Sequence, residues 1–211
     1  MKKGAAVSRT RAEKVFFFVG NSKCLDFVNT ELIVKGHRVD LLENFGDLIL
    51  WLVQVQALDA AAAREAVRRW DGRPEGRRVF EEGRAFRAVL RATVERIVNG
   101  KPAQQATLDA INKLLRNRIG YSQLIRVRGG FEQQFCSGAA KAIHLLVPLA
   151  EFASDLLGHY DLTLIKKCQN PVCILYFYDT TKNHARQWCS MRLCGNRIKV
   201  AAHYRRQRKG G

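Results

Sequence analysis

Four cysteines constrain this chain more than any other feature of its sequence. They form two pairs with the spacing C-x4-C, separated by fifteen residues, and they are Cys168, Cys173, Cys189 and Cys194. Tetrahedral Zn²⁺ takes four sulfur ligands at about 2.3 Å, and two close pairs joined by a short hairpin can converge on that geometry with little strain. The sequence therefore predicts one zinc ion that is held by these four thiolates.

The predicted zinc is structural, because four thiolates close the coordination shell and leave no position for an activated water. Disulfides are disfavoured, since the chain shows no secretion signal and has a large apolar part. Four reduced cysteines without metal are the remaining alternative. The other two cysteines, Cys24 and Cys136, stand in apolar surroundings and are expected to be buried thiols.

The residues within and between the two pairs predict a small domain. Asn170 and Pro171 suit a tight knuckle, the segment 174–178 reads as a strand, and 179–183 can form a turn. The second pair then opens a helix, from about Met191 to Gln207. This order of knuckle, hairpin and ligand-bearing helix resembles a treble clef, and a module of this kind takes on the order of 10 kcal/mol of its folding free energy from the metal.

Upstream of about residue 160 the apolar residues recur with the period of amphipathic helices. Helices are expected over 44–58, 59–70, 75–98, 104–118 and 139–157. Asp59 can cap the second of these, and Pro148 either kinks the last or divides it into two shorter pieces. A strand is expected at Phe16–Val19, followed by a helix that carries Leu25, Val28 and Leu32. Alternation from Tyr121 to Cys136, around Arg128-Gly129-Gly130, predicts a β-hairpin. The fold class is therefore mainly α with a short β-hairpin, a helical N-terminal domain preceding a small treble-clef-like zinc finger.

The distribution of charged residues supports the same division into a helical domain and a zinc finger. We expect a basic flexible tail at 1–14, a mainly helical domain at 15–160, and a zinc finger with a basic terminal helix at 161–211. The formal net charge is +17, and residues 166–211 carry eleven basic residues and a single acidic one. Such a segment attracts polyanions, and nucleic acid is the commonest polyanion that a soluble protein meets. A solubilising or partly disordered tail would have the same charge.

Basic side chains surround the second cysteine pair and continue along the expected terminal helix, which makes it a candidate for groove or phosphate binding. Asn196 could pair with adenine, although its amide could equally well lock the local backbone. Trp188 and Met191 are expected to pack the finger. The candidate nucleic-acid contacts are Arg186, Arg192, Asn196, Arg197, Lys199, Arg205, Arg206 and Arg208.

Two stretches resemble known families. The run from Arg186 to Lys199, which contains Cys194-Gly195-Asn196-Arg197, resembles the signature of the CGNR zinc-finger family. Upstream, Gly20 and the run Cys24–Thr30 resemble the opening of the ABATE domain that usually precedes this finger. The resemblance implies a stress-related bacterial transcription regulator. Gln187 departs from the pattern, which often has a second arginine before the tryptophan, and so removes one possible phosphate contact.

Three classes of function are compatible with these features. The first is a DNA-binding regulator, whose finger contacts duplex DNA and whose helical domain senses a small ligand or mediates assembly, for example as a homodimer. The second is a zinc-stapled module for RNA or protein, in which Phe177 could be available to stack on a base. An enzyme is disfavoured, because acids such as Asp26, Asp40 and Glu43 accompany no nucleophile or base. No run of about 18 apolar residues is present, so a soluble, cytoplasmic protein without a membrane partner is expected.

Overall fold

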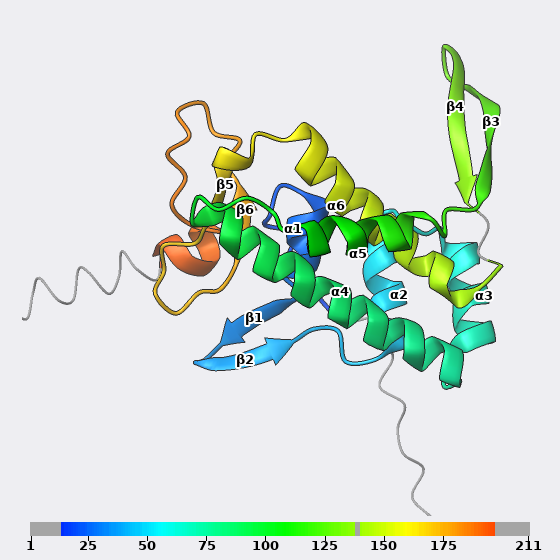
Figure 1. Ribbon diagram of the computed structural model, residues 1–211, viewed down its shortest axis with the longest axis horizontal. Coiled ribbons are helices and arrows are strands. Elements are labelled where there is room, and N and C mark those ends of the chain that lie inside the picture. Colours follow the sequence, from blue (N-terminus) through cyan, green and yellow to red (C-terminus); the bar gives the residue numbers. More distant parts are fainter. Residues whose placement is uncertain (1–13, 138–139, 197–211) are drawn as a thin grey trace, which may run out of the picture.

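The structure is a computed structural model that describes residues 14–137 and 140–196. Within these residues a helical body, which ends near residue 160, carries the cysteine-containing finger (residues 165–196) at one end (Figure 1). Three pairs of antiparallel strands accompany the helices in this part of the chain. The fold class is mainly α with short β-hairpins, as predicted. All but the last residue of the predicted basic tail, and most of the predicted terminal helix, lie outside the described residues.

The helical body contains all five helices that the sequence predicts between residues 44 and 157. The predicted helix 139–157 is split into a 3₁₀ turn and an α-helix, because Pro148 lacks an N–H and fits only the first turn of a helix. None of the described helices has both the length and the apolar composition needed to span a membrane. The helices are α1 (Lys23–Val28), α2 (Phe45–Gln54), α3 (Ala60–Trp70), α4 (Pro74–Val98), α5 (Gln105–Leu115) and α6 (Val147–His159), with 3₁₀ turns at Ala142–Leu146 and Leu162–Leu164.

Local chemistry explains where these helices begin. The carboxylate of Asp59 accepts the backbone N–H groups of Ala61 and Ala62, both at 2.8 Å, and so caps α3 as the sequence predicts. Asn44 caps α2 by accepting the N–H of Asp47 at 3.0 Å. Near the start of α4, a Cβ atom on Gly76 would lie 2.1 Å from the carbonyl oxygen of Trp70. Only glycine therefore allows α4 to follow α3 so closely.

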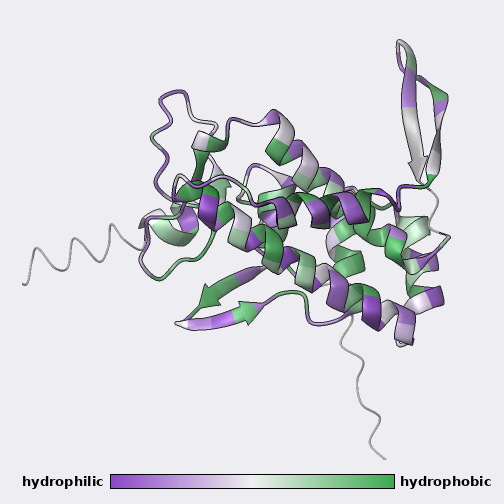
Figure 2. Ribbon diagram, in the orientation of Figure 1, coloured by the Kyte–Doolittle hydropathy of each residue, from purple (hydrophilic) through white to green (hydrophobic). Residues whose placement is uncertain are grey.

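The core lies where the apolar faces of the helices meet, and Figure 2 shows hydrophobic residues gathered along these faces. Trp51 of α2 is fully buried at its centre. Its ring lies 5.1 Å from that of Phe27 in α1 and 6.4 Å from that of Phe152 in α6, measured between centroids. Burying each large apolar side chain contributes about 1.5–3 kcal/mol, so this contact stabilises the packing of three helices.

The hairpin after α1 is not predicted by the sequence. The helix expected to carry Leu25, Val28 and Leu32 is present as α1 but ends at Val28. The strand expected at Phe16–Val19 is wrong, because residues 14–19 form no regular element. Leu32 instead pairs with Val39 in a hairpin of β1 (Glu31–Val34) and β2 (His37–Asp40). Its two-residue turn, Lys35-Gly36, has φ of 49° and 85°, as the tight turns of such hairpins require.

The other two strand pairs lie farther along the chain. The predicted hairpin is present as β3 (Gly120–Val127) and β4 (Gly130–Ser137), and it projects from the helical body (Figure 1). In the finger, β5 (Ile165–Lys167) pairs with β6 (Tyr176–Tyr178), and the first cysteine pair lies between these two strands. The sequence predicts the second of these strands but not the first.

Asn29 connects the finger to the helical body. The side chain is fully buried, and its amide donates to the carbonyl oxygen of Tyr176 at 2.8 Å. Its carbonyl oxygen accepts the N–H of the same residue at 2.9 Å. One side chain thus satisfies both backbone groups of Tyr176, as a neighbouring strand would. Nearby, Gly20 accepts the backbone N–H of Tyr178 at 2.8 Å.

We expect Asn29→Ala to lower the free energy of unfolding by about 2–3 kcal/mol, because it leaves a buried N–H and a buried C=O without partners. Urea denaturation of the zinc-loaded protein measures the change. Asn183→Ala is the matched control, since Asn183 is exposed, and this variant should unfold within about 0.5 kcal/mol of the parent. Equal midpoints for the two variants would show that the Asn29 amide does not hold the finger.

Candidate metal centre

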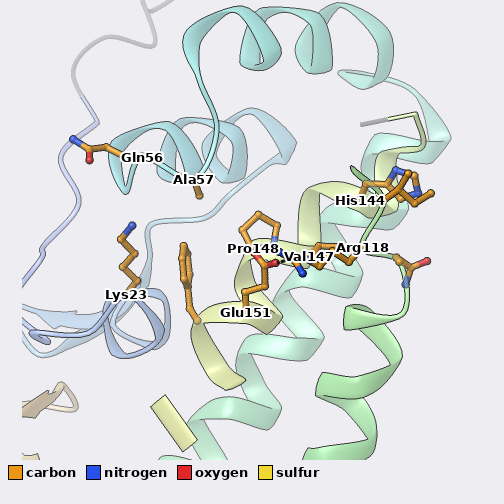
Figure 3. A pocket seen from close by; sticks show the side chains of 11 residues that line it. Lys23, Gln56, Ala57, Arg118, His144, Val147, Pro148 and Glu151 are labelled. Carbon is orange, nitrogen blue, oxygen red and sulfur yellow. Dashed lines mark ion pairs between the residues drawn. The ribbon is translucent and has the colours of Figure 1, made fainter. Parts of the chain in front are cut away.

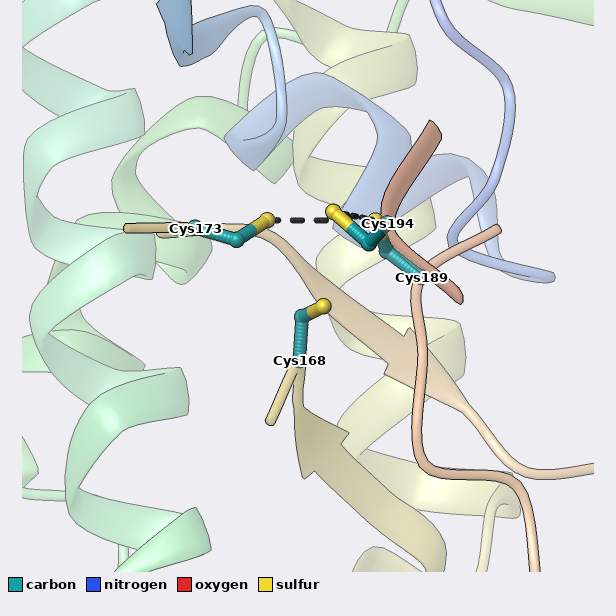
Figure 4. Close-up of side chains that lie close together, drawn as sticks. All are labelled: Cys168, Cys173, Cys189 and Cys194. Atoms are coloured by element: carbon teal, nitrogen blue, oxygen red, sulfur yellow. Dashed lines mark hydrogen bonds between the residues drawn. The ribbon is translucent and has the colours of Figure 1, made fainter. Parts of the chain in front are cut away.

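The four predicted ligands lie together in the finger (Figure 4). Their sulfur atoms are all within 4.8 Å of one another, with Cys189 at 3.6 Å from Cys194 and 3.8 Å from Cys173. Four sulfurs that each lie about 2.3 Å from a tetrahedral ion are about 3.8 Å apart. The donor set and its spacing therefore fit a single zinc ion.

The first cysteine pair is shaped by a knuckle around Asn170. This residue is buried; its side chain accepts the N–H of Val172 at 3.2 Å, and its carbonyl accepts the N–H of Cys173 at 2.8 Å. Cys168 donates its own N–H to Leu175 at 2.9 Å. These bonds fold residues 168–175 back on themselves, so that both sulfurs point to the same side.

The second cysteine pair is shaped by the helical turn Met191–Gly195, which begins where the sequence predicts. The carbonyl of Ser190 accepts the N–H of Cys194 at 2.9 Å. A Cβ atom on Gly195 would lie 2.6 Å from the sulfur of Met191 and 3.0 Å from the ring of Trp188. Gly195 therefore lies in close contact with both side chains, and a larger residue there would require Met191 to move.

The thiols differ in their tendency to ionise. Hydrogen bonds from the thiols of Cys173 and Cys189 lower the pKa of Cys168, and the same hydrogen bonds raise the pKa of both partners, so Cys168 is the first of the three thiols to ionise. Outside the cluster, burial raises the pKa of Cys24 to about 12, which fits the expected inert thiol. The side chain of Cys136 lies outside the described part of the chain.

Asp179 organises the loop between the two pairs. It is fully buried, and it accepts hydrogen bonds from the ammonium group of Lys166 at 2.7 Å, the hydroxyl of Thr181 at 2.6 Å and the N–H of Arg186 at 3.0 Å. Burial opposes its ionisation, but these hydrogen bonds outweigh burial and hold its pKa below the usual range. His184 is exposed in the same loop and is not part of the sulfur cluster.

Arg186 has a structural environment that the sequence does not predict. Its guanidinium group donates to the carbonyl oxygens of Trp188 at 2.9 Å, of Val19 at 2.8 Å and of Cys189. The same group lies 4.1 Å from the ring centroid of Phe177. Arg186 therefore joins the finger to the segment before α1, and its role as a nucleic-acid contact stays a prediction.

The remaining candidate contacts fall into two groups. Arg192 and Asn196 are exposed on the turn that carries Cys194. Phe177 is fully buried and cannot stack on a base, while Trp188 is half-buried against the cysteines and Met191 is 49% exposed. Packing is therefore as expected for Trp188 and only partial for Met191. Outside the described residues lie Arg197, Lys199, Arg205, Arg206 and Arg208.

Two family profiles match the chain. Residues 165–207 match the CGNR zinc finger, and residues 21–160 match the ABATE profile, described as "Putative stress-induced transcription regulator". The chain belongs to the ABATE family. Together with the four clustered cysteines, the match to the CGNR finger supports zinc binding by this segment. No curated protein matches the sequence.

The run Cys24–Thr30, which resembles the opening of the ABATE domain, stabilises the fold. Asp26 accepts the N–H of Gly20 at 2.7 Å, Asn29 holds Tyr176, and the hydroxyl of Thr30 donates to Phe27 at 2.8 Å. Burial raises the pKa of Asp26 to about 6. These polar side chains are buried and bonded to backbone, so the run fixes the end of the ABATE part where the CGNR finger attaches.

Arg91 joins the helical part to the finger, and the sequence does not predict this role. It lies on α4, donates to the carbonyl oxygen of Ile174 in the CGNR finger at 3.2 Å, and also donates to Val28 and, at 3.2 Å, to Glu31. Its position within an amphipathic helix gives no signal, because an arginine there is usually solvent-exposed.

Proposed function

We propose that this ABATE-family chain is a DNA-binding transcription regulator that acts in the cytoplasm. One structural zinc ion would hold the CGNR finger together, and the helical part would sense a ligand or mediate assembly, for example as a homodimer. The observation that carries the proposal is that a strongly basic segment follows directly after the predicted zinc ligands. Residues 192–209 follow directly from the second cysteine pair and contain seven basic residues and no acidic one.

The environment of the acidic residues favours a regulator over an enzyme. Asp26 is bonded to Gly20, and Asp40 is paired with Arg87 on α4, so both carboxylates already stabilise the fold. Four thiolates would leave zinc no open position for a water or a substrate. We therefore propose a binding protein, whose metal stabilises structure.

A titration of duplex DNA over a series of salt concentrations tests this function. We expect the logarithm of affinity to fall linearly with the logarithm of salt concentration, because bound arginines release the counterions of phosphates. Arg197→Gln and Arg205→Gln should each weaken binding and reduce the salt slope by about 1. Arg64→Gln, an exposed position on α3, is the control and should leave affinity and slope unchanged. A flat salt response of the parent would contradict DNA binding.

The alternative is a zinc-stapled module that binds RNA or protein. Burial of Phe177 removes the aromatic platform on which single-stranded RNA binding would depend. Competition between duplex DNA and single-stranded RNA of equal length decides between these partners, and we expect the duplex to compete more strongly.

A further inference from the structure

A pocket of about 280 Å³ opens on the helical part, away from the cysteines, and its walls come from α1, α6 and the segments that follow α2 and α5. Lys23 and Gln56 lie at one end of it, and Arg118 and His144 lie at the other, with Pro148 and Glu151 between them (Figure 3). Its volume is close to the lower limit for small-molecule sites in proteins. A ligand of this pocket must therefore be small.

The charges in the pocket favour an anion. The carboxylate of Glu151 is paired with the guanidinium group of Arg118, at 2.9 Å. Lys23 has no carboxylate within ion-pair distance among the described residues, and its ammonium group lies 5.1 Å from the ring centroid of Phe152. The pocket therefore offers a cation that is stabilised by an aromatic face and is available to a negatively charged group.

The apolar part of the wall favours a ligand with a hydrophobic body. Three apolar residues of α6 line the pocket, namely Val147 and Pro148 in its first turn and Phe152 one turn later. Phe152 also contacts Trp51, which in turn contacts Phe27, two residues before the Asn29 that holds the finger. The pocket wall and the anchor of the finger thus belong to one packed core.

We propose that this pocket binds a small carboxylic acid with a planar or compact apolar body. The carboxylate pairs with Lys23, and the apolar body packs on Pro148 and Phe152. This inference rests on the proposed function, since it names the class of ligand that the helical part of a regulator would sense. An anion without an apolar body, such as inorganic phosphate, leaves the α6 wall uncovered and should bind weakly.

Calorimetric titration of the full-length, zinc-loaded protein tests the inference with benzoate, phenylacetate and cyclohexanecarboxylate as probes. We expect at least one acid to bind saturably. The matched uncharged amide of that acid should bind at least about tenfold more weakly, because it cannot pair with an ammonium group. Inorganic phosphate should not compete. Failure of all three acids to bind, or equal binding of acid and amide, would overturn the proposal.

Variants of Lys23 show whether binding occurs at this pocket. Lys23→Met keeps the aliphatic stem over Phe152 and removes the charge, so affinity for the acid should fall about tenfold or more, while Lys23→Arg should retain most of it. Lys101→Met removes an exposed lysine elsewhere and should bind like the parent. If Lys23→Met and Lys101→Met bind equally, the site is not this pocket. Titrating DNA without any acid tests the finger separately, so either proposal can fail alone.

Discussion

Removing zinc is expected to unfold the segments around the cysteines and to leave the helical part of the chain folded. The buried cluster at the metal site contains Leu32, Leu175 and Phe177 besides three of the cysteines, which is a small core for a segment of this length. Metal binding contributes on the order of 10 kcal/mol to such modules. By contrast, the helical part has its own core around Trp51, which contains none of the four ligand cysteines.

The loss of structure should stop at β6. The N–H groups of Cys168, Cys173 and Cys194 donate to carbonyls within the two knuckles, so they should lose protection against hydrogen exchange when a chelator removes the metal. The N–H of Tyr176 donates to Asn29, and that of Tyr178 donates to Gly20. Because these partners belong to the helical part, the two tyrosine amides should stay protected.

Two cysteine variants make this experiment specific. Cys173→Ser removes a ligand, so this variant should bind little metal. Its hydrogen-exchange pattern should match that of the protein from which a chelator has removed the zinc. Cys24→Ala removes a buried thiol outside the cluster and should keep one zinc per chain, as measured by elemental analysis. Identical exchange before and after chelation, or sulfurs joined as disulfides in the purified protein, would contradict a structural zinc site.

The features that the sequence predicts well are those that depend on residues close together in the chain. The cysteine ligands can be identified because the two members of each pair are close in sequence, and a zinc site then requires only that the two pairs come together. Helix α4 can be identified because Val79, Phe86, Leu90 and Val94 repeat with helical period, and all four are buried.

Contacts between distant residues account for most of what the sequence does not predict. Arg87 lies within α4 and is buried because Asp40 and Thr30, about fifty residues earlier, meet it there. Arg186 reaches Val19, 167 residues away, for the same kind of reason. Arginines are usually solvent-exposed, so neither the local spacing nor the charge predicts that these two side chains are bonded within the fold. Only the packing of the finger against the helical part shows which arginine is already bonded.

Replacing Arg87 with methionine is expected to cost about 3 kcal/mol of stability. The side chain is only 3% exposed. Its two terminal nitrogens bind the two carboxylate oxygens of Asp40 at 2.7 and 2.6 Å, and one of them also donates to the hydroxyl of Thr30 at 2.6 Å. Breaking a buried pair costs about 3–5 kcal/mol, because the remaining charge has lost its partner. We expect the lower end, since Arg84 also lies 3.1 Å from Asp40.

Urea denaturation of matched variants separates this effect from a general loss of charge. Arg68→Met breaks an exposed ion pair with Glu65 and should cost less than about 1 kcal/mol. The double variant Arg87→Met, Asp40→Leu removes both charges and should recover much of the loss, because no buried charge then lacks a partner. Equal losses in the single and the double variant would show that packing, and not the unpaired carboxylate, sets the cost.

The pH dependence of stability gives an independent test of the same pair. Burial alone would raise the pKa of Asp40, but the hydrogen bonds from Arg87 and from the N–H of Leu42, with the nearby charges, hold this pKa below its usual range. A carboxyl group whose pKa is lower in the folded state stabilises the fold above its unfolded pKa, and this contribution is lost as pH falls through the folded value. The parent should therefore lose stability as pH falls below about 4, and Arg87→Met should lose less over the same range because its carboxyl group has lost that partner. Parallel curves for the two proteins would mean that the guanidinium group does not control the ionisation of Asp40.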